Sequence, residues 1–179
     1  MRTADLEQGH IEYIRGIANP IAVKIGASIT PETIIYLVKH LNPLNEAGKL
    51  TLIHRFGAKH IETHLPPLIE AVKSTNITVL WSCDPMHGNS RTTNFGIKTR
   101  DFDHILAELR TAFQLHKKYN SILAGVHFEM TGENVTECIG GAGGLQEIDL
   151  NHAYKSLVDP RLNYEQALEM AMIIADQIA

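Results

Sequence analysis

Residues 77–89 read "ITVLWSCDPMHGN", an apolar run that ends abruptly in aspartate, proline, methionine, histidine, glycine and asparagine. Its first part (77–83) is rich in β-branched and aromatic residues, which favours a β-strand. Nearly continuous hydrophobicity is typical of a parallel strand covered on both faces. Polar groups directly after such a strand are typical of functional sites in parallel α/β proteins. The stretch therefore predicts a parallel sheet and the position of a site on it.

Three other segments share this pattern of apolar and β-branched residues. They are "IAVKIG" (21–26), "LTLIHRFG" (50–57) and "ILAGVHFEM" (122–130). Each is followed by a loop and then by apolar residues at helical spacing. Thr30 and Pro31 have the chemistry of an N-cap and a first helical residue. The first helix is expected to begin at Pro31, the second to run from about Lys59 to Lys73, the third to begin near Asp101 and the last to follow Asn163.

Strand alternating with helix four times predicts right-handed crossovers and a parallel sheet. A complete (β/α)8 barrel takes about 250 residues and about eight such units. Four units in 179 residues therefore predict either half a TIM barrel or an open doubly wound sheet. No G-x-G-x-x-G turn follows the first strand, which weighs against dinucleotide binding. The length and the 44% hydrophobic content favour a single domain, residues 1–179.

Composition excludes several kinds of partner. A net charge of −4 provides no general basic field that would attract nucleic acid or an anionic membrane. No apolar run approaches the roughly 18 residues of a membrane span, and the polar start "MRTADLEQGH" has no signal-peptide core. Cys83 and Cys138 are too few for a disulfide framework. A cytoplasmic protein with reduced thiols is predicted.

Charged and metal-ligating side chains recur where the predicted strands end: Lys24, Arg55, Asp84, His87, His127, Glu129 and, before the last helix, Asp159. A buried lysine or glutamate costs several kcal/mol unless a partner compensates its charge. Lys24 and Arg55 have two interpretations. Either each is paired with a protein carboxylate, or together, at equivalent positions on adjacent strands, they clamp a phosphate or carboxylate ligand.

His87, Glu129 and Asp159 form a ligand set for a divalent transition metal, because imidazole nitrogen and carboxylate oxygen suit such ions. Three protein ligands leave coordination positions open for water or substrate. Asp84 and Pro85 are expected to shape the turn that aims the histidine inward. Cys83 is interpreted either as a fourth ligand or, more simply, as a small core residue.

The sequence has ten histidines, of which His54, His87 and His127 lie in or just after apolar runs. Six of the other seven lie among polar residues or on helix faces, and we expect them at the surface: His10, His40, His60, His64, His116 and His152.

Six segments resemble the class II 3-deoxy-D-arabino-heptulosonate 7-phosphate (DAHP) synthase family across essentially the whole chain. They are "KIGASITPE", "LTLIHRFG", "LWSCDPMHGN", "GIKTRDFDHI", "GVHFEMTGENVTECIGG" and "DPRLN". The resemblance implies condensation of phosphoenolpyruvate with erythrose 4-phosphate, the first step of the shikimate pathway of aromatic amino acid biosynthesis. It also implies a divalent metal such as Mn²⁺ or Co²⁺, and release of phosphate.

The resemblance assigns roles residue by residue. It implies that His87, Glu129 and Asp159 hold the metal, and that Lys24 and Arg55 hold the phosphate and carboxylate of phosphoenolpyruvate. Lys24, Arg55 and His87 are thus the expected catalytic residues. Two further substrate contacts are expected: Arg2 near phosphoenolpyruvate and Lys98, next to Arg100 before a helix, for the sugar phosphate, although a solvated loop lysine fits Lys98 equally.

The sequence also departs from the family's pattern. The family is much longer and has, before the part matched here, four more strands, a cysteine metal ligand and another arginine; Met1 stands where the family has a glutamate. The chain is therefore expected to be the C-terminal half of the TIM barrel, forming a homo-oligomer or requiring a complementary N-terminal half. Two alternatives stay open: a non-catalytic fragment that binds metal or phosphate only, and a metal-dependent hydrolase, which the extended motifs do not favour.

Overall fold

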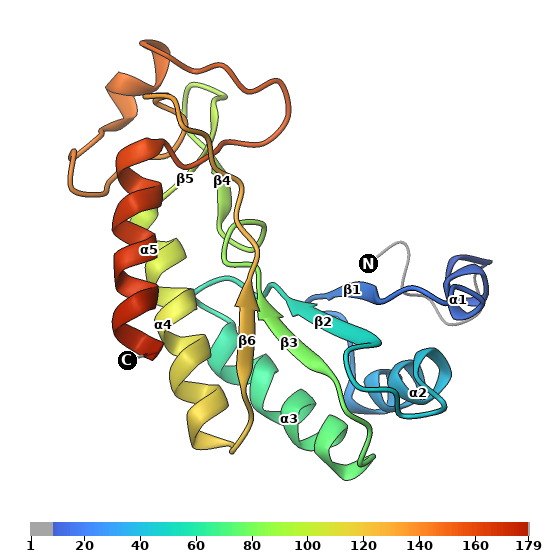
Figure 1. Ribbon diagram of the computed structural model, residues 1–179. Coiled ribbons are helices and arrows are strands. Elements are labelled where there is room, and N and C mark those ends of the chain that lie inside the picture. The colour runs from blue at the N-terminus through green and yellow to red at the C-terminus, as the bar shows by residue number, and fades with distance from the viewer. Residues whose placement is uncertain (1–8, 179) are drawn as a thin grey trace.

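A computed structural model describes residues 9–178, and its centre is a four-stranded parallel sheet (Figure 1). The strands lie in the order in which they occur along the chain, with every neighbouring pair parallel. They are β1 (Ile21–Ile25), β2 (Leu50–His54), β3 (Leu80–Cys83) and β6 (Leu123–Val126). All four predicted strands are present, but each is shorter than its apolar run, so Glu129 lies beyond the end of β6 rather than within it.

Helices follow the strands as the sequence predicts. They are α2 (Pro31–Leu41), α3 (Ile61–Ser74), α4 (Phe102–Lys118) and α5 (Tyr164–Ile178), and a short α1 (Gly9–Arg15) precedes β1. Thr30 is the N-cap of α2, because its hydroxyl accepts a hydrogen bond from the backbone N–H of Thr33 at 3.2 Å. Asn163 caps α5 in the same way, accepting from the N–H of Gln166 at 2.9 Å.

The strand order distinguishes between the two predicted architectures. A doubly wound sheet needs a point where the strand order reverses. Here the order β1-β2-β3-β6 never reverses, so successive right-handed crossovers bring α2, α3 and α4 to the same face, as Figure 1 shows. This is an α/β fold compatible with part of a TIM barrel, and the described strands do not close into a ring.

Burial differs from the prediction that the strands are covered on both faces. Along β2 it alternates: Leu50, Leu52 and His54 are buried against the helices, while Thr51 and Ile53 are partly exposed on the other face. The hydrophobic core therefore lies between the sheet and α2, α3 and α4. In the described residues 9–178, helices cover one face of the sheet and the other face stays open. The apolar runs in the sequence therefore predict more burial of the sheet than the structure has.

Two features were not predicted. After β3 the chain forms an antiparallel hairpin of β4 (Ser90–Thr92) and β5 (Lys98–Arg100), and between β6 and α5 it forms a long irregular segment with a 3₁₀ helix, η1 (Glu147–Asn151). In Figure 1 both lie beyond the carboxyl ends of the strands. They form a cap over this end, and the cap contributes Asp159 to the site.

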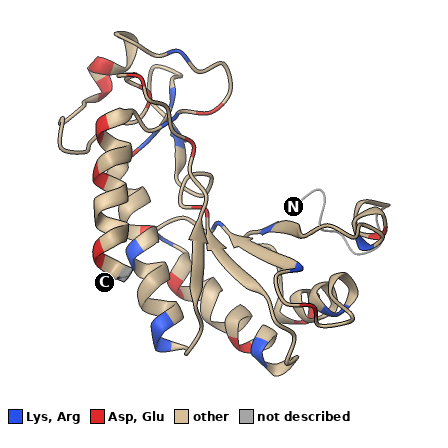
Figure 2. Ribbon diagram, viewed as in Figure 1, with Lys and Arg blue, Asp and Glu red and all other residues tan. Residues whose placement is uncertain are grey.

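Charged residues of both signs lie in this cap, as they also do on the helices (Figure 2). Figure 2 shows Lys, Arg, Asp and Glu close together around β4, β5 and the segment before α5, whereas the sheet ribbon is almost free of charge. None of the helices within the described part of the chain combines the length and apolar character needed to cross a bilayer. The expected core and the charged end of the sheet are thus separate parts of the molecule.

Candidate metal centre

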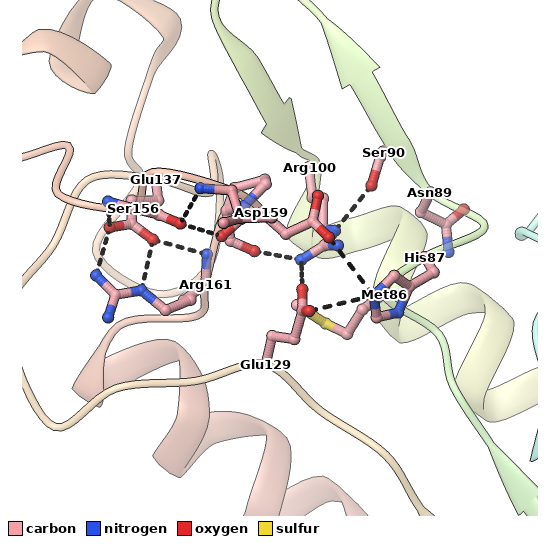
Figure 3. A network of polar contacts seen from close by, with 12 residues as sticks. Met86, His87, Asn89, Ser90, Arg100, Glu129, Glu137, Ser156, Asp159 and Arg161 are labelled. Carbon is pink, nitrogen blue, oxygen red and sulfur yellow. Dashed lines mark hydrogen bonds and ion pairs between the residues drawn. The ribbon is translucent and has the colours of Figure 1, made fainter.

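Three side chains from separate segments converge beyond the carboxyl end of the sheet. His87 follows β3, Glu129 follows β6, and Asp159 precedes α5 (Figure 3). Their ligand atoms lie within 4.8 Å of one another, and the His87 Nε2 is 3.1 Å from a Glu129 oxygen and 3.7 Å from an Asp159 oxygen. We call these three residues the rim cluster. An imidazole and two carboxylates facing one point are a suitable donor set for a divalent transition metal.

The rim cluster is reached from solvent. Its three side chains are each between a fifth and a third exposed. A hollow of about 390 Å³ is bordered by Glu129, Asp159 and Arg161 among others. A ligand can therefore approach the carboxylates without rearrangement of the sheet.

Asp84 orients the imidazole of His87. Its buried carboxylate lies 2.7 Å from the His87 Nδ1 and also accepts hydrogen bonds from the backbone N–H groups of Met86 and His87. A proton on Nδ1 therefore binds Asp84, which leaves Nε2 free to face Glu129 and Asp159. Burial works to raise the pKa of Asp84, but hydrogen bonds from Lys24 and His87 outweigh it and lower that pKa.

Lys24 is the second side chain that Asp84 binds. Its Nζ lies 2.7 Å from an Asp84 oxygen and 3.2 Å from the Nε2 of His127. The structure thus agrees with the interpretation in which Lys24 is paired with a protein carboxylate, that of Asp84. The lysine side chain as a whole remains about one-third exposed.

Arg55 behaves differently from Lys24. Within residues 9–178 it forms no ion pair, and its Nε is buried without a hydrogen-bond partner. The two cations are also not level, since Lys24 pairs in register with Ile53, two residues before Arg55. Lys24 and Arg55 are therefore offset by two residues and do not occupy the equivalent positions that the sequence predicts, although both lie near the same edge of the sheet.

Two further cations neutralise the carboxylates of the rim cluster. Arg100 is fully buried, and its guanidinium group donates to Glu129 at 2.6 Å, to the Ser90 hydroxyl at 3.0 Å and to the carbonyl of Pro160. Lys98, one pleat away on β5, pairs with Asp159. This hydrogen bond from Lys98 is the largest factor that lowers the pKa of Asp159. Lys98 is thus an ion-paired residue of β5 whose side chain remains about half exposed to solvent.

Sequence reasoning missed part of this network. It named Arg100 only as a neighbour of Lys98 and gave no role to Glu137, which anchors the loop that carries Asp159. The available signal was an arginine directly before a helix and an acidic residue within "ENVTECIGG" (133–141), a stretch otherwise suited to the interior. Arg2 lies outside the described residues, so its predicted contact stays a prediction.

A second group of potential ligands lies inside the core. His54, Cys83 and Glu108 are fully buried, and their donor atoms also lie within 4.8 Å of one another. We call these residues the core cluster. Cys83 belongs here and not to the rim cluster, as the core interpretation predicts, and burial raises the pKa of its thiol.

His116 stacks on His54 with ring centroids 5.5 Å apart and is itself buried. The expectation that His116 lies at the surface is therefore wrong. The segment before it alternates charge with apolar residues, and the helical turn brings this histidine onto the buried stripe of α4 together with Glu108.

Fold and site together define a parallel α/β protein with metal-ligating and cationic groups at the carboxyl edge of its sheet. The sequence pattern of the class-II DAHP synthetase family matches residues 1–175. The chain belongs to this family.

Named relatives agree with this assignment. The chain is 49% identical to the phospho-2-dehydro-3-deoxyheptonate aldolase of Neurospora crassa over 177 residues, which are 98% of this chain and 37% of that protein. It is 45% identical to the phospho-2-dehydro-3-deoxyheptonate aldolase of Mycolicibacterium smegmatis over 177 residues, 99% of this chain and 38% of the relative. The chain thus spans well under half the length of these two relatives.

Proposed function

We propose that the chain provides the metal centre and part of the phosphoenolpyruvate site of a DAHP synthase, which condenses phosphoenolpyruvate with erythrose 4-phosphate and releases phosphate. The observation that carries this proposal is the convergence of His87, Glu129 and Asp159 next to Lys24. Family membership supports the same reaction. The four βα units are then the C-terminal half of a TIM barrel.

The rim cluster would hold the divalent metal, with Mn²⁺ or Co²⁺ as the ions that its nitrogen and oxygen donors suit. When bound, such an ion supplies Lewis-acid polarisation of the aldehyde oxygen of erythrose 4-phosphate. Asp84 keeps the His87 Nε2 directed at this position by occupying Nδ1. Lys98 and Arg100, paired with the two carboxylates, keep the negative charge of the cluster compensated.

The role of Lys24 and Arg55 would be to bind the anionic groups of phosphoenolpyruvate. Arg55 has a buried Nε without a partner in the described part of the chain, which fits a guanidinium group that pairs with a ligand. Lys24 would bind as a point charge while Asp84 holds its ammonium group in place. Orienting the enol carbon towards the aldehyde turns an encounter between two substrates into an oriented reaction. Arg2 and Lys98 are proposed as further substrate contacts.

Assembly is part of the proposal. β1 and β6 are the edge strands of the described sheet, and its open face carries Lys24 and partly exposed β2 residues. Unpaired parallel edges favour further strand pairing. We therefore propose two ways in which this face is covered: by a complementary N-terminal barrel half, or by another copy of the chain in a homo-oligomer. The cytoplasmic location stays a prediction from sequence.

Two measurements test this function. Mn²⁺ titration of the purified chain should show one site whose affinity falls at least about 100-fold in His87→Ala. Phosphate release from phosphoenolpyruvate should then depend on Mn²⁺, on erythrose 4-phosphate and on His87. Unchanged Mn²⁺ affinity in His87→Ala would remove the basis of the proposal.

The alternative function is a non-catalytic chain that binds metal or phosphate only. It is favoured by the open sheet, because the four described strands do not close into a ring and Lys24 lies on the partly exposed face. His87-dependent Mn²⁺ binding without phosphate release, both alone and with the N-terminal part of the Neurospora crassa relative added, would support this alternative. Phosphate release restored by that addition would support the synthase.

A further inference from the structure

One buried carboxylate anchors the loop that carries Asp159. We call residues 155–161 the Asp159 loop. One Glu137 oxygen accepts hydrogen bonds from the backbone N–H of Lys155 at 3.1 Å and of Ser156 at 2.8 Å. The other accepts from the backbone N–H of Arg161 at 2.8 Å. Glu137 therefore binds the main chain of the loop on both sides of Asp159.

The Arg161 side chain closes this arrangement. Its Nε and Nη2 donate to the two Glu137 oxygens at 2.9 and 2.7 Å, a bidentate pair in which the carboxylate is completely buried (Figure 3). Such pairs fix geometry as well as charge. Five donors on one carboxylate leave little freedom for the segment that supplies them.

Glu137 is also tied to the element that faces Asp159. The Thr99 hydroxyl donates to the Glu137 carbonyl at 2.8 Å, and Thr99 lies between Lys98 and Arg100 on β5. Lys98 pairs with Asp159, and Arg100 with Glu129. The Asp159 loop and β5 are thus both hydrogen-bonded to Glu137, which lies outside the rim cluster.

Resting on the proposed function, we infer that Glu137 is a positioning residue for the metal: by holding the Asp159 loop, it sets where the Asp159 carboxylate stands relative to His87 and Glu129. All five hydrogen bonds to its side chain come from the Asp159 loop and none from the sheet or its covering helices. Loss of these bonds releases one ligand of the rim cluster and leaves the sheet intact. Metal affinity is then the property that responds most.

The substitution Glu137→Gln tests this role with little change in shape. An amide group has only one oxygen, so its NH₂ would face N–H donors and the ion pair with Arg161 would be lost. We expect Mn²⁺ affinity to fall about 10- to 100-fold, the range found when a partner that orients a ligand is removed. Glu133→Gln is the matched control, because Glu133 pairs with the same loop only through the exposed Lys155 ammonium group. It should retain wild-type affinity.

A double substitution separates positioning from general destabilisation. In an Asp159→Asn background the ligand that Glu137 is inferred to position is already weakened, so adding Glu137→Gln should lower Mn²⁺ affinity by less than about twofold further. An undiminished 10-fold loss in that background would overturn the inference. So would wild-type Mn²⁺ affinity in the single variant Glu137→Gln.

Amide hydrogen exchange without metal keeps this test distinct from that of the proposed function. In Glu137→Gln the amides of Ser156 and Arg161 should exchange at least 10-fold faster, while amides of β2 and β3 keep their rates. Unchanged exchange at both loop amides would overturn the positioning role even if metal binds. A wild-type chain that binds no Mn²⁺, with exchange as expected, would instead overturn the proposed metal centre and leave Glu137 as an anchor of the loop alone.

Discussion

The rim cluster and the core cluster contain nearly the same chemistry in opposite surroundings. Each has a histidine and at least one carboxylate, with ligand atoms within 4.8 Å of one another. The rim cluster is partly exposed, and its carboxylates are paired with Lys98 and Arg100. In the core cluster no ligand atom can be reached from solvent, because His54, Cys83 and Glu108 are completely buried.

The difference lies in what each group already binds. Both ring nitrogens of His54 lack a hydrogen-bond partner within the described residues. The Glu108 oxygens accept hydrogen bonds from the Phe56 N–H at 2.8 Å and from the Asn89 side chain at 2.7 Å. Its carboxylate therefore joins the loop after β2 to the loop after β3. Proximity of ligand-type residues alone does not define a site, since access and existing partners decide what they do.

The largest expected effect sharpens this contrast. Glu108→Ala would leave the Phe56 N–H and one N–H of the Asn89 amide without a partner, at about 1–3 kcal/mol for each donor, while Asn89 keeps its hydrogen bond to the Pro85 carbonyl. We expect the free energy of unfolding to fall by about 3 kcal/mol, measured by urea denaturation. Asp103→Ala, at an exposed position of the same helix, should change it by less than about 1 kcal/mol. Equal stability of the two variants would contradict the assigned role of Glu108.

The next effect concerns the rim cluster. In Asp84→Asn the side chain keeps its size, but the charged acceptor of the His87 Nδ1 is lost and Lys24 loses its ion pair. Mn²⁺ affinity should fall about 10- to 100-fold in calorimetric titrations. Asp101→Asn is the control, because Asp101 pairs with Arg91 and is not bonded to His87. If Asp84→Asn bound Mn²⁺ as tightly as this control, orientation of His87 would not matter.

The fold could be predicted from sequence because its signals are local. Four apolar runs and helix caps such as Thr30 and Asn163 specify the βα units, and their structures agree. Enclosure of the sheet was overestimated, since an apolar run such as "LTLIHRFG" does not reveal whether anything covers its second face. The β4–β5 hairpin was missed because its strands are only three residues long and polar, without an apolar alternation.

The site was predictable to the extent that it follows from strand ends. His87 and Asp84 come directly after β3, so their position follows from the topology. Arg100 and Glu137 were not assigned, because their partners lie 29 and 24 residues away in loops whose paths no local pattern specifies. His116 was misjudged for a related reason, since only the packing of α4 against β2 and β3 shows that its ring is enclosed.

The smallest effect is a pH dependence that originates in the core cluster. Burial lowers the pKa of His54 to about 3 and that of His116 to about 4, whereas burial raises the pKa of Glu108 to about 7. Each histidine binds its proton more readily when unfolded, so its stabilising contribution is lost as pH falls below about 6.5. Glu108 changes the stability in the opposite direction. Its carboxylate binds a proton more tightly in the folded protein than in the unfolded chain, so the folded state loses stability as pH rises from about 4.5 to 7.

Between pH 5 and 6.5 acidification therefore lowers the free energy of unfolding through the two histidines and raises it through Glu108. Each group changes the free energy of unfolding by about 1.4 kcal/mol per pH unit, so the wild type should lose about that amount per unit on acidification. In His54→Leu one histidine and Glu108 remain, their slopes cancel, and urea midpoints at pH 5 and 6.5 should nearly coincide. His152→Leu, at an exposed position, should retain the wild-type slope. A wild-type slope in His54→Leu would show that the buried imidazole does not couple folding to pH, and the contrast between the two clusters would then rest on Glu108 alone.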